Sequence, residues 1–324
     1  MRRFTINMAI KVRFFLPPFK KGGLITPNLQ DMAGFLPCNL GITTPEGRPG
    51  LGPAPHTLDC MEVKQGIRRN FARRADSYDR HAEMQRLMAH GLVAAVGESL
   101  ARAGRILEIG CGTGYLTKLL RQANGEARLV ALDLDAALVD AARRRLGPEA
   151  GVAWLVADGE APLRGEYDLI IANATFQWFI RPGETLAALY RNLAPGGVLA
   201  FSTLGPQTFQ ELAGSLNRAA RSLNLPAPPP IPAQGFGDRK TWSGRLYRAG
   251  FPQVRLAREI ATATFPSVKE FLKALQATGA TNPRPGHFSP RLLQALMAAY
   301  ETHYGRDGAI PVSYEMIWAV ADKY

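Results

Sequence analysis

A glycine-rich loop stands between a short apolar stretch and a helical pattern. It reads Glu108-Ile-Gly110-Cys-Gly112-Thr-Gly114, after the apolar run 105–109 and before the amphipathic segment 115–123. Glycines at this place let the backbone turn tightly and approach a ligand closely. The dinucleotide fingerprint needs a glycine at the sixth position of G-x-G-x-x-G, and that position is Tyr115. The loop therefore predicts a ligand with a ribose and an amino-acid moiety, and no pyrophosphate.

Polar residues also close the next three apolar stretches of the chain. In order, these are Asp133 with Leu134, Asp158 with Gly159, and Asn173. Any one of them can be a turn residue or a helix cap. Together they predict a rim of acceptors, at which Asp133 receives ribose hydroxyls and Asp158 receives an exocyclic amino group.

Cys111 is the loop residue whose type could act as a nucleophile. No His/Asp pair lies beside it in the sequence, so a small loop residue is the better interpretation. With Cys38 and Cys60 the chain has three cysteines, and none forms a Cys-x-x-Cys pair. A disulfide framework and a Cys-rich zinc site are therefore excluded. We expect no metal and a cytoplasmic protein.

Apolar stretches alternate with helical patterns through most of the chain. Strands are predicted over 105–109, 128–134, 152–156, 167–172, 198–203, 254–264 and 312–321. Continuous apolar runs joined by helices predict a parallel, doubly wound α/β sheet covered on both faces. A helix is predicted over 207–223, and five prolines within 226–232 interrupt the alternation. The segment of about 205–240 is therefore predicted to be a helical lid insertion.

The first 60 residues differ in composition from the rest. Eight prolines and seven glycines make up a quarter of them, a share typical of low-complexity or disordered chain. Lys11 and Arg13 interrupt the apolar stretch near the start, which excludes a secretory signal. We expect 1–60 to be a disordered extension, or a mis-assigned start with translation beginning at Met61. Residues 61–324 are expected to form the folded domain.

The chain is basic, with 39 Lys and Arg against 27 Asp and Glu and a formal charge of +12. A basic chain can bind nucleic acid, but no long polybasic run with interleaved aromatics is present. Two interpretations stay open, an Arg-rich solvated surface and a surface suited to an acidic partner. No apolar run approaches the ~18–20 residues that span a bilayer, so no membrane segment is expected.

The loop pattern G-x-G-x-G, with an acid two residues upstream, is typical of class I S-adenosylmethionine (SAM) methyltransferases. Residues 64–322 further resemble the malonyl-[acyl-carrier protein] O-methyltransferase family of biotin synthesis. The narrower signals are Phe71-Ala-Arg-Arg-Ala75-x-x-Tyr78-Asp-x-His81-Ala-x-x-Gln85, Asn173-x-x-x-Gln177-Trp178, Gly279-Ala-Thr-Asn282 and Pro311-x-x-Tyr314. The resemblance implies a Rossmann-like methyltransferase sheet, mostly parallel with an antiparallel last strand.

The resemblance also implies a reaction, the transfer of a methyl group from SAM to the free carboxyl of malonyl-acyl carrier protein. That acidic carrier protein would be the partner, with no nucleic acid or membrane, and the chain would be a monomer. The carboxylate is ionised at neutral pH, given reference pKa values near ~4, so no general base is required. Tyr78 and Gln177 are the expected catalytic residues, although the helical pattern alone fits Tyr78 equally well as a core aromatic. SAM would be held by Glu108, Gly110, Gly112, Gly114, Asp133, Leu134, Asp158, Gly159 and Asn173.

Two other functions stay open on the sequence alone. One is methylation of another small acid on the same scaffold. The other is an assembly or binding factor that keeps the fold without methyl transfer. Intact glycines and strand-end acids favour retained SAM binding, although binding alone does not establish transfer. Methylation of nucleic-acid amino groups is disfavoured, because residues 173–176 read Asn-Ala-Thr-Phe rather than Asn/Asp-Pro-Pro-aromatic.

Overall fold

The structure is a computed structural model that describes residues 64, 82–161, 163–225, 228, 231–277 and 289–324. The predicted extension 1–60, the catalytic candidate Tyr78 and the motif 279–282 lie outside the described residues. The glycine loop, the strand-end acids and Gln177 lie within them.

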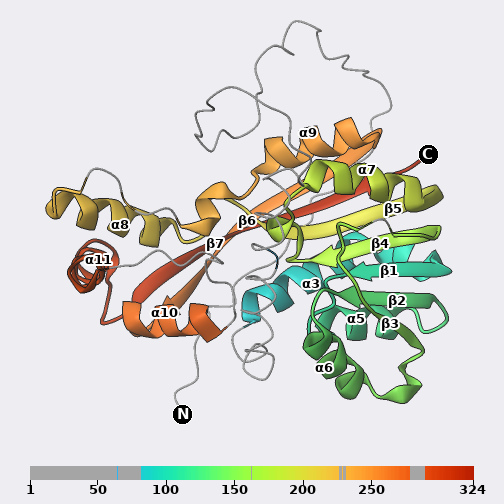
Figure 1. Cartoon of the computed structure of the whole chain (residues 1–324), viewed down its shortest axis with the longest axis horizontal. Helices are drawn as coiled ribbons and strands as arrows, with labels where there is room; N and C mark the ends of the chain where they lie inside the picture. The colour runs from blue at the N-terminus through green and yellow to red at the C-terminus, as the bar shows by residue number, and fades with distance from the viewer. Residues whose placement is uncertain (1–63, 65–81, 162, 226–227, 229–230, 278–288) are drawn as a thin grey trace, which may run out of the picture.

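One seven-stranded sheet organises the described chain, in the order β3-β2-β1-β4-β5-β7-β6 (Figure 1). Its strands are β1 (Arg105–Ile109), β2 (Arg128–Asp133), β3 (Val152–Val156), β4 (Tyr167–Asn173), β5 (Leu193–Leu204), β6 (Gln253–Phe265) and β7 (Ile310–Asp322). The pairs among β1 to β5 are parallel, and β7 runs antiparallel to both β5 and β6. The prediction of a mostly parallel sheet with an antiparallel last strand is confirmed. Because the parallel strands end at one edge, the loops that follow them meet there.

Helices cover both faces of this sheet. They are α3 (Glu83–Ala95), α4 (Gly97–Arg102), α5 (Tyr115–Ala123), α6 (Ala136–Leu146), α7 (Pro182–Asn192), α8 (Gln210–Ser222), α9 (Arg239–Ala249), α10 (Val268–Ala277) and α11 (Pro290–Tyr304). Side chains of α3, α4 and α5 pack on one face with Ile106 and Leu169. Those of α7 and α9 pack on the other face with Leu107 and Ile170 (Figure 1). Successive strand residues therefore enter opposite cores, which explains the continuous apolar runs in the sequence.

The first described helix, α3, is held on the sheet by an apolar stripe and a buried hydrogen bond. Met84, Met88 and Leu92 recur every four residues and are buried, so they share one face of the helix. The Trp318 Nε1–H on β7 donates to the Met88 carbonyl at 2.9 Å. No helix in the described part of the chain is long and apolar enough to cross a membrane.

The connection from β5 to α8 is hydrogen-bonded to β7, and this moves the start of α8. The sequence predicts a helix from residue 207, but α8 begins at Gln210. The backbone N–H groups of Gly205 and Phe209 donate to the carbonyls of Glu315 at 2.8 Å and Ser313 at 2.7 Å. Phe209 also adopts a left-handed backbone, with φ of 60°. Hydrogen bonding to a neighbouring strand therefore outweighs the local helical preference.

The strand β5 likewise begins earlier than the predicted residue 198. Leu193 already pairs with Tyr167 of β4, and regular pairing resumes between Val198 and Leu169. The residues between these pairs form a bulge, with Gly196 at φ of 73°. Glycine adopts this backbone conformation at little cost, so the chain turns at Gly196 inside the strand.

A separate small core lies at the extended ends of β6 and β7. There α8, α10 and α11 enclose Leu216, Phe271 and Tyr300 (Figure 1). The Tyr300 hydroxyl donates to the Pro311 carbonyl at 2.8 Å. The predicted lid segment 205–240 thus contributes α8 to this core, and its function as a lid stays a prediction.

The contact between α3 and Trp318 generates a test of this packing. A Cβ at Gly91 would lie 2.8 Å from Trp318 Nε1, so Gly91→Ala should lower the free energy of unfolding by about 1–3 kcal/mol through overpacking. Gly97→Ala is the matched control, since a Cβ there meets no atom of the described part of the chain within 4 Å and alanine favours helix. Thermal denaturation checks both variants. Equal melting temperatures for Gly91→Ala and the unsubstituted chain would contradict the described contact.

Candidate active site

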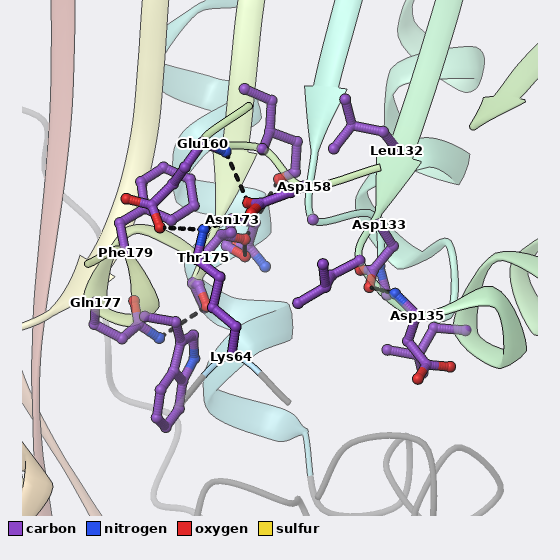
Figure 2. A pocket seen from close by; sticks show the side chains of 18 of the residues that line it. Lys64, Leu132, Asp133, Asp135, Asp158, Glu160, Asn173, Thr175, Gln177 and Phe179 are labelled. Atoms are coloured by element: carbon purple, nitrogen blue, oxygen red, sulfur yellow. Dashed lines mark hydrogen bonds and ion pairs between the residues drawn. The ribbon is translucent and has the colours of Figure 1, made fainter. Parts of the chain in front are cut away.

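A pocket that is partly open to solvent lies at the carboxyl edge of the sheet (Figure 2). Most of its lining comes from the loops after β1, β2, β3 and β4, as expected for the switch point of an open parallel sheet. Of the residues predicted from the sequence, the lining includes Gly110, Gly112, Asp133, Leu134, Asp158, Gly159, Asn173 and Gln177. Glu108 and Gly114 are not part of it.

The Asp133 carboxylate is fixed by two backbone donors. Its Oδ2 accepts from the Gly112 N–H at 2.9 Å, and its Oδ1 accepts from the Asp135 N–H at 3.0 Å. Loss of hydration raises the pKa of Asp133 above its ordinary value, and these two N–H groups oppose that shift. A carboxylate has about four acceptor positions, so Asp133 keeps acceptor capacity for hydroxyls in the pocket.

Two glycines of the loop, Gly110 and Gly112, have different surroundings. Gly110 has φ of 75°, and a Cβ there would collide with the Thr175 side chain after β4. Gly112 has φ of 53°, yet a Cβ there would meet no atom of the described residues within 4 Å. Gly110 therefore lets two loops approach, whereas Gly112 leaves room on the pocket side for a ligand to approach the backbone.

Glu108 lies behind the loop rather than in the pocket. Its side chain is buried, and neither carboxyl oxygen accepts a hydrogen bond of normal geometry from the described residues. Burial raises the pKa of Glu108 to about 8, with the Thr117 hydroxyl opposing the shift and the Asp133 charge adding to it. Glu108 is therefore mostly protonated at neutral pH. The neighbouring Cys111 is also buried, and burial raises the pKa of its thiol, which fits a packing role.

A charged cluster that the sequence did not reveal lies on the wall opposite Asp133 (Figure 2). The Lys64 ammonium pairs with Asp158 and lies 2.7 Å from Glu160 Oε2. Burial lowers the pKa of Lys64, but hydrogen bonds to the two acids and their charges outweigh it, so the pKa is raised. Glu160 also accepts the backbone N–H groups of Ile180 at 3.0 Å and Arg181 at 2.6 Å. The loop after β3 is thereby tied to the start of α7.

Asn173 is hydrogen-bonded to the scaffold at both ends of its amide. Its Nδ2 donates to the Gln85 carbonyl of α3 at 3.0 Å, and its Oδ1 accepts from the Ser202 hydroxyl at 2.6 Å. Each end of a carboxamide can form a second hydrogen bond. Asn173 therefore connects α3, β4 and β5 while still facing the pocket.

Gln177 has the same kind of double anchoring. It lies in the 3-10 turn η3 (Phe176–Trp178), where its Nε2 donates to the Ala174 carbonyl at 2.8 Å and its Oε1 accepts from the Thr203 hydroxyl at 3.0 Å. Ala174 has φ of 51°, an uncommon conformation for a non-glycine residue. The amide is thus held in one orientation, with one N–H and one lone pair left for a ligand.

Comparisons with known proteins agree with this site. A model of the family described as "Methyltransferase domain" matches residues 78–282. The malonyl-[acyl-carrier protein] O-methyltransferase of Anoxybacillus flavithermus is 39% identical over 264 residues, covering 81% of this chain and 98% of that protein. The protein of the same name from Brevibacillus brevis is 34% identical, covering 80% of this chain and 96% of its own length.

This chain belongs to the malonyl-[acyl-carrier protein] O-methyltransferase family. The match covers almost the whole of both relatives and about four fifths of this chain. The resemblance found from the sequence motifs is confirmed.

Sequence reasoning missed the part of this methyltransferase pocket that depends on tertiary contacts. Lys64 and Asp158 are 94 residues apart in the sequence, and no local motif connects them. Glu160 follows Asp158 by two residues, but its role depends on the start of α7. A pair of acids spaced two apart after a predicted strand was the one available signal.

Burial of Glu108 predicts a pH dependence of stability. Its folded pKa of about 8 lies above the unfolded reference near ~4.3. The folded state therefore holds the proton more strongly, so the free energy of unfolding falls as pH rises from about 4.3 to about 8. Glu108→Gln should flatten this slope and melt higher than the unsubstituted chain at pH 8.

Thermal melts at several pH values between 5 and 8 measure this effect. Glu98→Gln is the control, because the Glu98 side chain is 90% exposed and should leave the slope unchanged. An identical slope in Glu108→Gln and the unsubstituted chain would contradict a buried protonated carboxyl.

Proposed function

We propose that this chain transfers a methyl group from SAM to the free carboxyl of malonyl-acyl carrier protein. The observation that carries the proposal is the Asp133 carboxylate, held by the Gly112 N–H at 2.9 Å on the open side of the glycine loop. The relatives are named for this reaction. The methyl ester would prime the chain elongation that the resemblance connects with biotin synthesis.

The pocket residues suit the three parts of SAM. Asp133 would accept the ribose hydroxyls, and the backbone at Gly110 and Gly112 would face the amino-acid moiety. Asp158 would accept the adenine amino group, next to an apolar wall at which Gly159 lies against Ile109 and Phe179. When bound, SAM supplies a methyl group made electrophilic by its sulfonium charge. The acidic lining fits that positive charge.

The protein contributes alignment rather than proton transfer. A malonyl carboxylate is already ionised at pH 7, and the described pocket lining contains no histidine. Holding the carboxylate in line and removing its water can lower the barrier by several kcal/mol. The anchored Gln177 amide offers its remaining N–H for that orientation, and Tyr78 is proposed to act with it.

The surface charge supports an acidic protein partner. Arg239, Lys240 and Arg248 are exposed on α9, a helix with no acidic residue in its sequence. The first turn of α9 follows Phe236 closely, and Phe236 packs edge-on against Trp178 in the pocket lining at 6.1 Å between ring centroids. Of these basic residues, Arg239 and Lys240 lie in the first turn, on the side of Phe236 and Trp178. Such charges would raise the encounter rate with an acidic carrier protein more than the final affinity.

The test is incubation with isotope-labelled SAM and malonyl-acyl carrier protein, followed by mass measurement of the carrier protein. One methyl group should appear on the malonyl carboxyl. Methylation of other small acids in preference would support the wider small-acid function. SAM binding without transfer to any acid would support a binding or assembly factor.

Asp133→Ala should weaken SAM binding about 10–100-fold, because a hydrogen bond to a charged acceptor contributes roughly 1.5–3 kcal/mol. Calorimetry on the folded variant measures the dissociation constant. Asp140→Ala is the matched control, since Asp140 is exposed on α6 and does not line the pocket. Unchanged SAM affinity in Asp133→Ala would remove Asp133 from the site.

Tyr78→Phe should fold and bind SAM nearly as well as the unsubstituted chain, yet transfer methyl about 5–150-fold more slowly, a loss of roughly 1–3 kcal/mol. At saturating SAM and substrate, the rate should show no base ionisation between about pH 6 and 8. Steady-state kinetics over that range measure both effects. Full turnover in the variant would assign Tyr78 to the core, and a steep pH profile would reveal a general base.

A further inference from the structure

Lys64 carries a charge in the pocket to which the proposed function assigns no role. It belongs to the pocket lining and reaches across the pocket to the two acids after β3 (Figure 2). Its side chain is 21% exposed, against 33% for Asp158 and 1% for Glu160. Among the described ion pairs, Lys64 is the cation that these two carboxylates share.

We propose that Lys64 is a positioning residue for the adenine end of the cofactor site. It holds the carboxylates of Asp158 and Glu160 together, so that Asp158 faces the pocket in one fixed orientation. This inference rests on the proposed SAM site and names a residue that completes it.

Two carboxylates on one short loop need a shared cation. Asp158 and Glu160 are two residues apart and both contact the Lys64 ammonium, so their like charges lie close together and repel each other. Glu160 cannot turn into solvent, because its oxygens accept the N–H groups of Ile180 and Arg181. Without Lys64, the freer Asp158 would relieve the repulsion by moving away.

Asp158 keeps acceptor capacity while it is paired. Its Oδ1 accepts from the Glu160 N–H at 2.9 Å, and its Oδ2 accepts from Lys64. Each carboxylate oxygen has a second acceptor position, and the exposed third of the side chain supplies access from the pocket. An exocyclic amino group would therefore add to the Lys64 contact rather than replace it.

The Asp158 orientation matters for recognition of one edge of the base. A fixed acceptor distinguishes a base with an exocyclic amino donor from one with a carbonyl at the same place, because the latter sets two acceptors against each other with no hydrogen between them. Loss of Lys64 should therefore weaken the binding of ligands that carry this amino group more than the binding of ligands that lack it. A purely structural lysine would affect all nucleoside ligands alike.

The experiment measures binding of two ligands to the full chain by calorimetry. S-adenosylhomocysteine carries the amino group, and S-inosylhomocysteine carries a carbonyl instead. The variants are Lys64→Met and Lys64→Arg, with Lys118→Met as control because Lys118 is exposed on α5. Thermal melts confirm that each variant is folded.

Lys64→Met should weaken S-adenosylhomocysteine binding by about tenfold and S-inosylhomocysteine binding much less, so that discrimination between them shrinks. Lys64→Arg should restore much of the discrimination, and Lys118→Met should change neither ligand. Equal losses for both ligands would show a structural role only and overturn the proposal. Unchanged S-adenosylhomocysteine binding in Lys64→Met would also overturn the proposal. Tighter binding would overturn it too, by showing that Lys64 competes with the ligand for Asp158. If the unsubstituted chain binds neither SAM nor S-adenosylhomocysteine, the proposed function itself fails, and this inference with it.

Discussion

The end of β2 holds the glycine loop through three backbone N–H groups, and the pocket depends on this contact. Gly110 and Cys111 donate to the Leu132 carbonyl at 2.8 and 2.9 Å, and Gly112 donates to the Asp133 carboxylate. The contact exists because β1 and β2 pair in parallel with Ile109 opposite Leu132. One register therefore sets the loop, the start of α5 and the position of the acid. The N–H groups that Asp133 fixes offset only part of its loss of hydration, and its pKa stays raised.

The opposite side of the pocket depends on polar contacts of the same kind, made between elements distant in sequence. The amide of Asn173 connects α3 with β5, and that of Gln177 connects η3 with β5. Thr175 donates to the Ile109 carbonyl at 3.3 Å, across the gap between the loops after β1 and β4. Because each of these side chains is hydrogen-bonded on the protein side, its remaining donor or acceptor is presented in a fixed direction. Preorganised groups of this type suit a reaction that needs alignment more than proton transfer.

Local sequence signals predicted the parallel α/β sheet, the glycine loop and the acids at the strand ends, because apolar runs and glycine spacing are visible within a few residues. The start of α8 and the early start of β5 could not be found this way. Both depend on hydrogen bonds to another strand, which outweigh local preference. Glu108 shows a further limit, since the motif placed it with the cofactor residues and the structure places its side chain in the core behind them. Lys64 was missed because its partner Asp158 is 94 residues away in the sequence. Only folding of the chain brings the two charges together.

The charges around the pocket bear on how two ligands would share it. The described lining carries four carboxylates, Asp133, Asp135, Asp158 and Glu160, and one ammonium, Lys64, which is already paired. Such a wall attracts a cation and repels an anion, at about 4 kcal/mol for unit charges 4 Å apart at an effective dielectric constant of 20. The neutral side chains of Gln177 and Trp178 come from η3, on a side of the lining that carries none of these four acids. A carboxylate substrate is therefore best accommodated on that neutral side, and its repulsion from the acids falls when a sulfonium occupies the space between. Because methyl transfer removes the sulfonium charge, the acids that attract the sulfonium hold the demethylated product less strongly.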